Sequence, residues 1–486
     1  MNIRKATFSA TRWTTVASLS RVSVQLLQTA LLARLLLPAD FGLIAMAGVA
    51  LGIAAMLADL GLSSALMHFP MPDHRTFSTI YWLNIGIGCC LALLFALLSW
   101  PLANMYGHME LLPVLAWLSL IFPLSALGQP FRVLAEKNLN FKPLAQNEIF
   151  STIIGFTTAI VLALTDGGVF SLVFPMLVTA AINSMLAWLR LSSDLRPGLL
   201  FHAPLAKSYI SFGLHRVGDG FWNTLQVQTD IFLAGLISNP AAVALYALPR
   251  EQCLKVANMV INPVITRVGL PVMTKIKNDQ DALCTIYLKI LRTTASLNFP
   301  IYAALALFAE EAVAILLGDQ WQNAAFYMRI FAIWGLIRST GNPSGSLLYA
   351  VGMAKRAHIW NMALFILTFP ILCIAAKTGG LPTLAWTMLV WQVIIFFLAW
   401  KFLVQPACGA DFFSYTCSIA PPFIATFFTV LVGIFFVEAL PKLWGVYVSA
   451  SVFCIAYLIF SYLFNRELLY LMRELLTPLL GKKVFR

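Results

Sequence analysis

Charged residues are scarce in this sequence. Asp, Glu, Lys and Arg make up 11% of its 486 residues, whereas hydrophobic residues make up 60% and the mean hydropathy is +0.84. A soluble globular domain carries about 25% charged and about 45–50% apolar residues. This composition excludes a soluble globule and indicates a polytopic membrane protein.

Motifs of nucleotide hydrolysis and metal catalysis are missing as well. The chain has no GxxxxGK[ST] phosphate loop and no HExxH pair, and its eight cysteines show no metal-ligand spacing. No polar stretch is long enough for a soluble catalytic domain, so we expect a protein that is not an enzyme, with no cofactor and no metal. The basic, polar N-terminus lacks the apolar core and cleavage site of a removable signal peptide.

Long apolar segments, in contrast, are abundant. One membrane-spanning helix needs about 20 mainly apolar residues. The expected fold class is therefore all-α, with about fourteen transmembrane helices near residues 13–36, 41–64, 77–100, 111–130, 148–165, 168–190, 208–235, 241–266, 285–309, 323–350, 359–377, 382–404, 418–439 and 443–464.

The basic residues indicate the orientation of these helices. If the N-terminus is cytoplasmic and the helices alternate, the inner segments hold most of the 32 Lys and Arg residues, whereas the outer loops hold only Lys377 and Lys442. This distribution follows the positive-inside rule. We expect both termini to be cytoplasmic and read the net charge of +12 as a topology signal rather than a nucleic-acid footprint.

An internal repeat relates the two halves of the chain. The stretch "LLARLLLPADFGLIAMA" (31–47) aligns without gaps with "LAGLISNPAAVALYALP" (233–249) at an offset of 202 residues. Each stretch ends one helix, turns at a proline and begins the next helix. Six predicted helices separate the two copies, which is the pattern of a parallel repeat.

Polar residues form a stripe on the first helix of each half. Helical spacing of three and four residues places each set on one face. The sets are Thr14, Ser18, Arg21, Gln25 and Gln28, and then Arg216, Asp219, Asn223, Gln226 and Asp230. The second stripe begins in "GLHRVGDGFW" (213–222), whose glycines would let the helix bend or pack closely.

Two further stripes lie on the eighth and tenth predicted helices. They comprise Glu251, Lys255, Asn258 and Asn262, and Arg338, Asn342 and Ser346. Glu251 and Lys255 are spaced for an i,i+4 ion pair. Facing lipid, each charge would cost roughly 2.5–3.5 kcal/mol, so the stripes are expected to face a central aqueous cavity. The alternative is an interhelical hydrogen-bond network without a transport role.

Three stretches resemble a known family: "LLARLLLPADFGLIAMAGVALGIAAMLADLGLSSAL" (31–66), "INPVITRVGLPVMTKIKND" (261–279) and "LLGDQWQNAAFYMRIFAIWGLIRSTGNPSGSLLYAVGMAK" (316–355). The chain resembles the polysaccharide-transport family of the multidrug/oligosaccharidyl-lipid/polysaccharide exporter superfamily, of the colanic-acid and O-antigen flippase type. The resemblance implies two six-helix lobes around a central cavity and two further helices, expected at 1–195, 205–404 and 405–486.

The resemblance also implies a substrate, an undecaprenyl-pyrophosphate-linked oligosaccharide moved across the bacterial inner membrane. Related flippases line their cavity with arginines on the first, second and eighth helices. Arg21 and Arg250 match the first and eighth positions, whereas the second helix carries Asp59 instead. Other polysaccharide assembly proteins, such as a polymerase and a chain-length regulator, are the expected partners.

The sequence therefore predicts a flippase that works by alternating access. Candidates for holding pyrophosphate or acidic sugars are Arg21, Arg216, Arg250, Lys255 and Arg338. Candidates for bonding sugar hydroxyls are Gln25, Gln28, Asn223, Gln226 and Asn258, and candidates for ion coupling are Asp59, Asp219, Asp230 and Glu251. The alternatives are a drug or metabolite antiporter of the same superfamily and a membrane enzyme such as a polysaccharide polymerase.

Overall fold

The computed structural model describes the backbone of residues 3–192, 195–260, 269–439 and 442–466. Within these ranges, the side chains of residues 3–12, 14–15, 19, 214–219, 256–260, 438–439, 442–444 and 446 lie outside the description.

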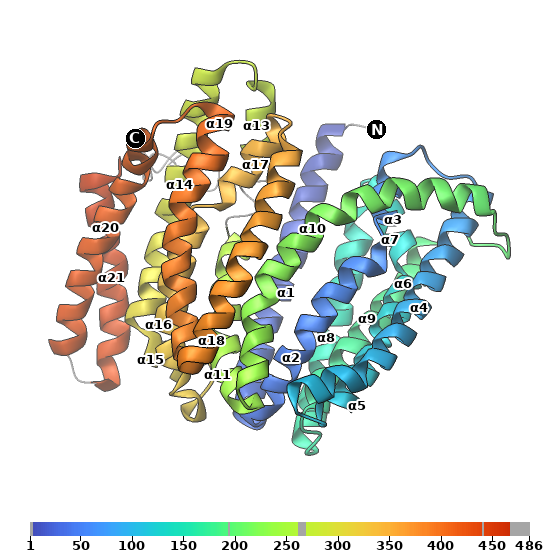
Figure 1. The fold of residues 1–486 in the computed structure, drawn as a ribbon, viewed down its shortest axis with the longest axis horizontal. Coiled ribbons are helices and arrows are strands. Elements are labelled where there is room, and N and C mark those ends of the chain that lie inside the picture. Colours follow the sequence, from blue (N-terminus) through green and yellow to red (C-terminus); the bar gives the residue numbers. More distant parts are fainter. Residues whose placement is uncertain (1–2, 193–194, 261–268, 440–441, 467–486) are drawn as a thin grey trace. The chain divides into compact units, whose positions relative to one another are not determined.

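Every regular element in the described part of the chain is a helix (Figure 1). The helices are α1 (Ile3–Leu35), α2 (Pro38–Asp59), α3 (Leu62–His68), α4 (His74–Tyr106), α5 (Leu111–Leu118), α6 (Ile121–Ala126), α7 (Gln129–Lys137), α8 (Phe141–Leu164), α9 (Phe170–Leu191), α10 (Ala203–Ile237), α11 (Pro240–Val260), α13 (Leu270–Lys275), α14 (Gln280–Leu307), α15 (Ala309–Leu316), α16 (Ala324–Ser339), α17 (Asn342–Ala350), α18 (Ala354–Ala399), α19 (Gln405–Cys408), α20 (Phe412–Ala439) and α21 (Lys442–Phe464).

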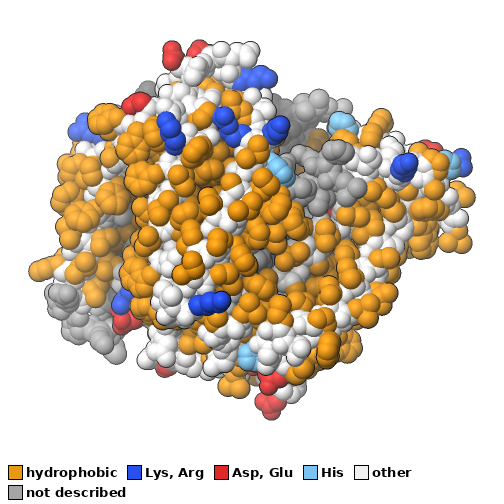
Figure 2. Space-filling model, in the orientation of Figure 1, with side chains coloured by type: hydrophobic (Ala, Val, Ile, Leu, Met, Phe, Trp, Pro, Cys, Tyr) orange, Lys and Arg blue, Asp and Glu red, His pale blue; other side chains and the backbone are white. Residues whose placement is uncertain are grey.

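Several of these helices are long and apolar enough to cross a membrane. In the described residues eight helical stretches meet that condition, and two bent pairs, α5–α6 with α7 and α14 with α15, raise the number to ten. Large apolar side chains such as Leu93, Leu97 and Trp100 of α4 are exposed, and hydrophobic side chains dominate the visible face in Figure 2. The all-α, polytopic fold class is thus confirmed, while the number of fourteen spans stays a prediction.

Contacts divide the chain into two compact units. Unit 1 comprises Met1–Ala247, Leu316–Gln320 and Asn361–Leu381, and unit 2 comprises Leu248–Ile315, Trp321–Trp360 and Pro382–Arg486. The helix α18 passes from unit 2 into unit 1 and back, and it breaks at Gly379 and Gly380, where Gly380 has a φ of +65°. Two separate segments were expected there, at 359–377 and 382–404. The lobe boundaries at 195 and 405 stay predictions.

In unit 1, α1 packs against α8, which in turn packs against α9, while α10 packs along α2, α3 and α4 (Figure 1). The contact between α2 and α10 depends on glycines. A Cβ at Gly61 would lie 2.5 Å from the Cα of Gly213, and a Cβ at Gly213 would overlap the carbonyl oxygen of Leu60. Two turns further along α10, a Cβ at Gly220 would collide with the side chain of Met56. We call this contact the α2–α10 seam.

The opposite end of α2 meets the turn that follows α10. A Cβ at Gly42 would overlap the carbonyl oxygen of Pro240, which begins α11. Pro38 and Pro240 are the equivalent prolines of the 202-residue repeat, so the N-terminal part of α2 in one copy contacts the start of α11 in the other within unit 1.

In unit 2, α14 packs against α16, α17 and α20, and α20 lies beside α21 (Figure 1). Its buried core includes Tyr287, Leu291 and Phe299 of α14. The hydroxyl of Tyr302 donates a 2.7 Å hydrogen bond to the backbone carbonyl of Cys253 in α11. This bond ties α11 to α14, so the polar residues of α11 are held on a fixed support.

Candidate functional site

The polar stripe on α1 includes an ion pair with α8, a helix that packs against α1 but is far from it in the sequence. Arg21 Nη1 donates to the carboxylate of Glu148 in α8. The Arg21 side chain is 47% exposed and that of Glu148 is 31% exposed. An exposed guanidinium within the apolar stretch of a spanning helix is costly against lipid. Arg21 is therefore placed to meet water or a polar ligand, and its guanidinium is only partly occupied by Glu148.

The Arg21–Glu148 pair is part of a larger group of charges in unit 1. Arg132 of α7 interacts electrostatically with both Glu136 and Glu148. Its Nη2 also donates a 3.3 Å hydrogen bond to the carbonyl of Ser125. Opposite charges within such a network share the desolvation cost that a single charge would carry alone. The carboxylate of Glu148 therefore interacts with two guanidinium groups, that of Arg21 in an ion pair and that of Arg132 electrostatically. If Arg21 turns away, Glu148 still interacts with Arg132.

The remaining polar residues of α1 follow Arg21 on the next turns. Gln25 is exposed and Gln28 is half-buried. The backbone carbonyl of Gln25 accepts a 2.8 Å hydrogen bond from the hydroxyl of Thr29. The three sequence-predicted residues of α1 are therefore accessible along one helix, which is the arrangement a polar ligand needs.

Asp59 lies at the end of α2 in a separate hydrogen-bonded cluster. Its Oδ1 accepts from the Ser63 backbone amide at 3.1 Å, from the Ser63 hydroxyl at 2.6 Å and from Gln129 Nε2 at 2.7 Å. Gln129 also donates to the Ser63 hydroxyl oxygen at 2.9 Å. These bonds join the α2–α3 turn to the start of α7. These three hydrogen bonds join Asp59 to neighbouring helices, so the geometry favours a structural role.

The polar stripe on α10 runs from an accessible to a buried position. Asn223 is exposed, Gln226 is half-buried and Asp230 is fully buried. The hydroxyl of Tyr246 donates a 3.1 Å hydrogen bond to Oδ2 of Asp230. The backbone at Arg216 and Asp219 is helical, but their side chains lie outside the described residues.

On α11 in unit 2, the expected i,i+4 ion pair is confirmed. Lys255 Nζ lies 2.8 Å from Glu251 Oε1, and the two side chains are 23% and 58% exposed. Arg250, one residue earlier, is buried. The side chain of Asn258 lies outside the described residues.

The last of the predicted cationic residues, Arg338, lies in the final turn of α16. Its guanidinium carbon lies 5.1 Å from the ring centroid of Trp334, which is a cation–π contact. This contact holds a half-buried arginine against an aromatic face.

Sequence reasoning missed Glu148 and Gln129. Glu148 was placed at the first residue of an expected span at 148–165, where a charge is unremarkable. The helix α8 instead begins at Phe141, so Glu148 lies two turns inside it. Its spacing from Arg21 is 127 residues, and no local pattern connects the two. If the helix had been expected to begin near residue 141, Glu148 would have been recognised as a charge within the span.

Comparison with known proteins supports the resemblance stated from the sequence. The model of a family described as "Polysaccharide biosynthesis protein" matches residues 31–326. The chain is 27% identical over 433 residues to the lipopolysaccharide biosynthesis protein WzxC of Escherichia coli (strain K12), covering 89% of this chain and 88% of that protein. It is 26% identical over 425 residues to the teichuronic acid biosynthesis protein TuaB of Bacillus subtilis (strain 168), covering 87% and 88%.

The fold is also found among solved structures. An inward closed conformation of the lipid II flippase MurJ superposes with a TM-score of 0.72 over 94% of this chain and 99% of that chain, at 13% sequence identity. At this identity the likeness shows a shared fold. Together with the apolar helices, it indicates a multi-pass membrane protein that shares the fold of that chain.

Proposed function

We propose that this chain, which belongs to the polysaccharide biosynthesis protein family, moves a lipid-linked oligosaccharide across a membrane. The substrate in this proposal is an undecaprenyl-pyrophosphate-linked repeat unit, and the membrane is the bacterial inner membrane with both termini of the chain on the cytoplasmic side. Support comes from relatives named for the biosynthesis of lipopolysaccharide and teichuronic acid and from the fold shared with a lipid II flippase.

The observation that carries the proposal is the half-exposed Arg21 paired with Glu148. A diphosphate and a carboxylate compete for the same guanidinium donors, because both accept the paired N–H groups of arginine. A diphosphate carries more charge than Glu148 and can displace it from Arg21. Arg132 then remains in range of Glu148 and compensates its charge. The pair thus provides a cation that can be released to a substrate and recovered afterwards.

The other polar residues have assigned roles in the same proposal. Gln25, Gln28, Asn223 and Gln226 bond sugar hydroxyls, since their amides both donate and accept. Arg250, Lys255 and Arg338 contribute positive charge on α11 and α16. The roles of Arg216 and Asn258 stay predictions.

Analysis of the lipid-linked products tests this function directly. In cells that lack the protein, we expect repeat units of full sugar composition to accumulate on the cytoplasmic leaflet, and surface polysaccharide to be lost. A membrane polymerase or glycosyltransferase would instead alter chain length or sugar content. Unchanged lipid-linked pools together with altered drug resistance in a pump-deficient strain would favour the drug or metabolite antiporter.

We further propose that an ion gradient drives transport, with Asp230 as the coupling carboxylate. Asp230 is buried and bonded to Tyr246, and buried carboxylates within spans commonly relay protons. In reconstituted vesicles, the initial rate of transport is expected to rise with an imposed proton or sodium gradient, and Asp230→Asn should remove that dependence. Glu251→Gln is the control, because Glu251 is 58% exposed and already paired with Lys255.

The remaining carboxylates fit coupling less well. Asp59 Oδ1 already accepts three hydrogen bonds within the protein, and the side chain of Asp219 lies outside the described residues. Transport by the unmodified protein that is insensitive to both gradients would contradict the coupling proposal.

A further inference from the structure

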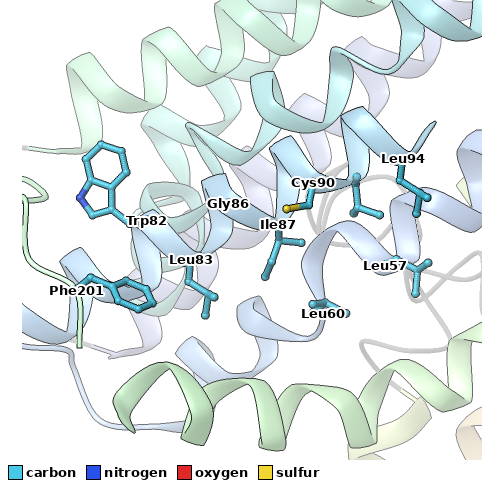
Figure 3. Close-up of a pocket in the computed structure, with 10 residues that line it drawn as sticks. Leu57, Leu60, Trp82, Leu83, Gly86, Ile87, Cys90, Leu94 and Phe201 are labelled. Carbon is cyan, nitrogen blue, oxygen red and sulfur yellow. The ribbon is translucent and has the colours of Figure 1, made fainter. Parts of the chain in front are cut away.

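An apolar pocket of about 610 Å³ opens on unit 1, away from the ion pair of α1. Figure 3 shows that α4 forms its long wall, from Trp82 through Gly86 to Leu94, and that Leu57 of α2 and Leu60, which directly follows α2, line the other side. Hydrocarbon side chains make up almost all of the lining. The wall between residues 82 and 94 is about 18 Å long at 1.5 Å per helical residue. One leaflet of a bilayer has a hydrocarbon thickness of roughly 15 Å.

A short strap closes one end of this pocket. The segment 198–202 is tied to the first turns of α4 by three hydrogen bonds. The Gly198 amide donates to the hydroxyl of Ser78 at 2.8 Å, the His202 amide donates to the hydroxyl of Thr79 at 3.2 Å, and Trp82 Nε1 donates to the Gly198 carbonyl at 2.8 Å.

The strap presents apolar side chains outward. Phe201 lines the pocket and is 59% exposed, and its neighbour Leu199 is 91% exposed. Because the Trp82 N–H is bonded within the protein, the indole adds an apolar face and little unsatisfied polarity to the pocket. Exposed aromatic and aliphatic groups beside a tied loop are typical of the boundary between headgroups and acyl chains.

Basic residues lie in the segments that flank the strap and begin α4. His74 and Arg75 occupy the first turn of α4, Arg196 precedes the strap by two residues, and Lys207 lies in the second turn of α10. All four are exposed. Two carboxylates belong to the same segments: Asp73, whose side chain accepts from the Thr76 amide and caps α4, and Asp194, which lies outside the described residues. Arg75, Arg196 and Lys207 outnumber Asp73 and Asp194, so these segments carry a net positive charge.

From this arrangement we infer that the pocket holds one acyl chain of an anionic phospholipid, whose phosphate lies at the rim formed by Arg75, Arg196 and Lys207. Apolar length, an aromatic boundary and a cationic rim occur in the order in which a phospholipid presents its chain, glycerol and phosphate. A protein partner would not account for the cationic rim and the long apolar wall together. The site is separate from the Arg21–Glu148 pair, so the inference holds whether or not the proposed transport function does.

Native mass spectrometry of the purified full chain tests this inference. The protein is equilibrated with equal amounts of phosphatidylglycerol and phosphatidylcholine that carry the same acyl chains. We expect preferential retention of phosphatidylglycerol. Arg75→Ala and Arg196→Ala should each lower that preference about fivefold, since a basic residue near a membrane surface contributes about 1 kcal/mol towards an anionic lipid.

Variants that fill the pocket provide a second test of the inference. A Cβ at Gly86 meets no atom within 4 Å, so Gly86→Leu adds volume inside the pocket without a backbone clash. This variant should lose the retained lipid. Gly48→Leu on α2 is the matched control, because a Cβ there also meets no atom within 4 Å and Gly48 does not line the pocket. If Gly86→Leu fails to fold, Cys90→Trp narrows the pocket from the next turn.

Three results would overturn the inference. These are equal retention of the two lipids by the unmodified protein, unchanged retention in the pocket-filling variants, and displacement of the retained phospholipid by undecaprenyl phosphate. The last result would assign the pocket to the path of a polyprenyl substrate instead.

Discussion

Replacing Arg21 by alanine is expected to lower export of the lipid-linked oligosaccharide about 10- to 100-fold while leaving the amount of folded protein unchanged. Hydrogen bonds to charged groups contribute about 1.5–3 kcal/mol, which corresponds to this range of rates if they form with the substrate. Folding should tolerate the change because the pair is 47% and 31% exposed, and exposed ion pairs contribute little to stability. The measurement is surface polysaccharide per unit of protein in complemented deletion cells.

Arg34→Ala is the matched control for that experiment. Arg34 is also an exposed arginine of α1, and it lies in the last turn of the helix, where a long side chain reaches the membrane surface. Export by this variant should remain close to that of the unmodified protein. Equal losses in Arg21→Ala and Arg34→Ala would show that α1 needs its charges for insertion rather than for substrate.

A substitution of Glu148, the partner of Arg21, distinguishes a substrate site from a structural ion pair. If Arg21 is released to the substrate, Glu148→Gln removes its competitor, and export should be kept or increased. If the pair only holds α1 against α8, Glu148→Gln should be as harmful as Arg21→Ala. Arg21→Lys keeps the charge but loses paired donation, and we expect it to retain part of the export activity.

Replacing Gly61 by alanine is expected to destabilise the protein by about 2–4 kcal/mol. Gly61 has a φ of +70°, a conformation that costs other residues about 1–2 kcal/mol. The added Cβ would also lie 2.5 Å from the backbone of Gly213, and such overpacking costs about 1–3 kcal/mol. Thermal unfolding of the detergent-purified protein, followed by gel-filtration fluorescence, measures the loss.

Gly48→Ala gives the reference value for this comparison. Gly48 belongs to α2 as well, but a Cβ there meets no atom within 4 Å. Alanine in a helix interior is favoured over glycine by roughly 0.8–1 kcal/mol, so this variant should be at least as stable as the unmodified protein. A Gly61→Ala variant as stable as Gly48→Ala would disprove close contact at the α2–α10 seam.

Local pattern predicted much of the individual helices. The break of α18 at Gly379 and Gly380 falls between two expected segments, because glycine at a positive φ interrupts a helix wherever it occurs. The Glu251–Lys255 pair was expected from its spacing and is present at 2.8 Å. By contrast, the expected single helix at 323–350 is divided into α16 and α17 at Thr340 and Gly341, although Gly341, Asn342 and Pro343 are a local signal for a turn and a new helix start.

The glycines of "GLHRVGDGFW" illustrate the limit of such reasoning. The sequence predicted either bending or close packing at Gly213, Gly218 and Gly220. In the structure, Gly213 meets the turn at Leu60 and Gly61, and Gly220 meets Met56. Close packing is therefore their role at two of these positions, and the contacting residues are more than 150 positions away along the chain.

The sequence by itself determined the class of this protein and the helices that carry polar residues. Lipid imposes this result, because every spanning segment must be apolar and every exception must be kept from the hydrocarbon. Only the tertiary structure decided which groups these polar and charged residues contact. The partners of Arg21, Asp59 and Gly61 are Glu148, Gln129 and Gly213, and these pairings arise from helix packing, which leaves no periodic trace in the chain.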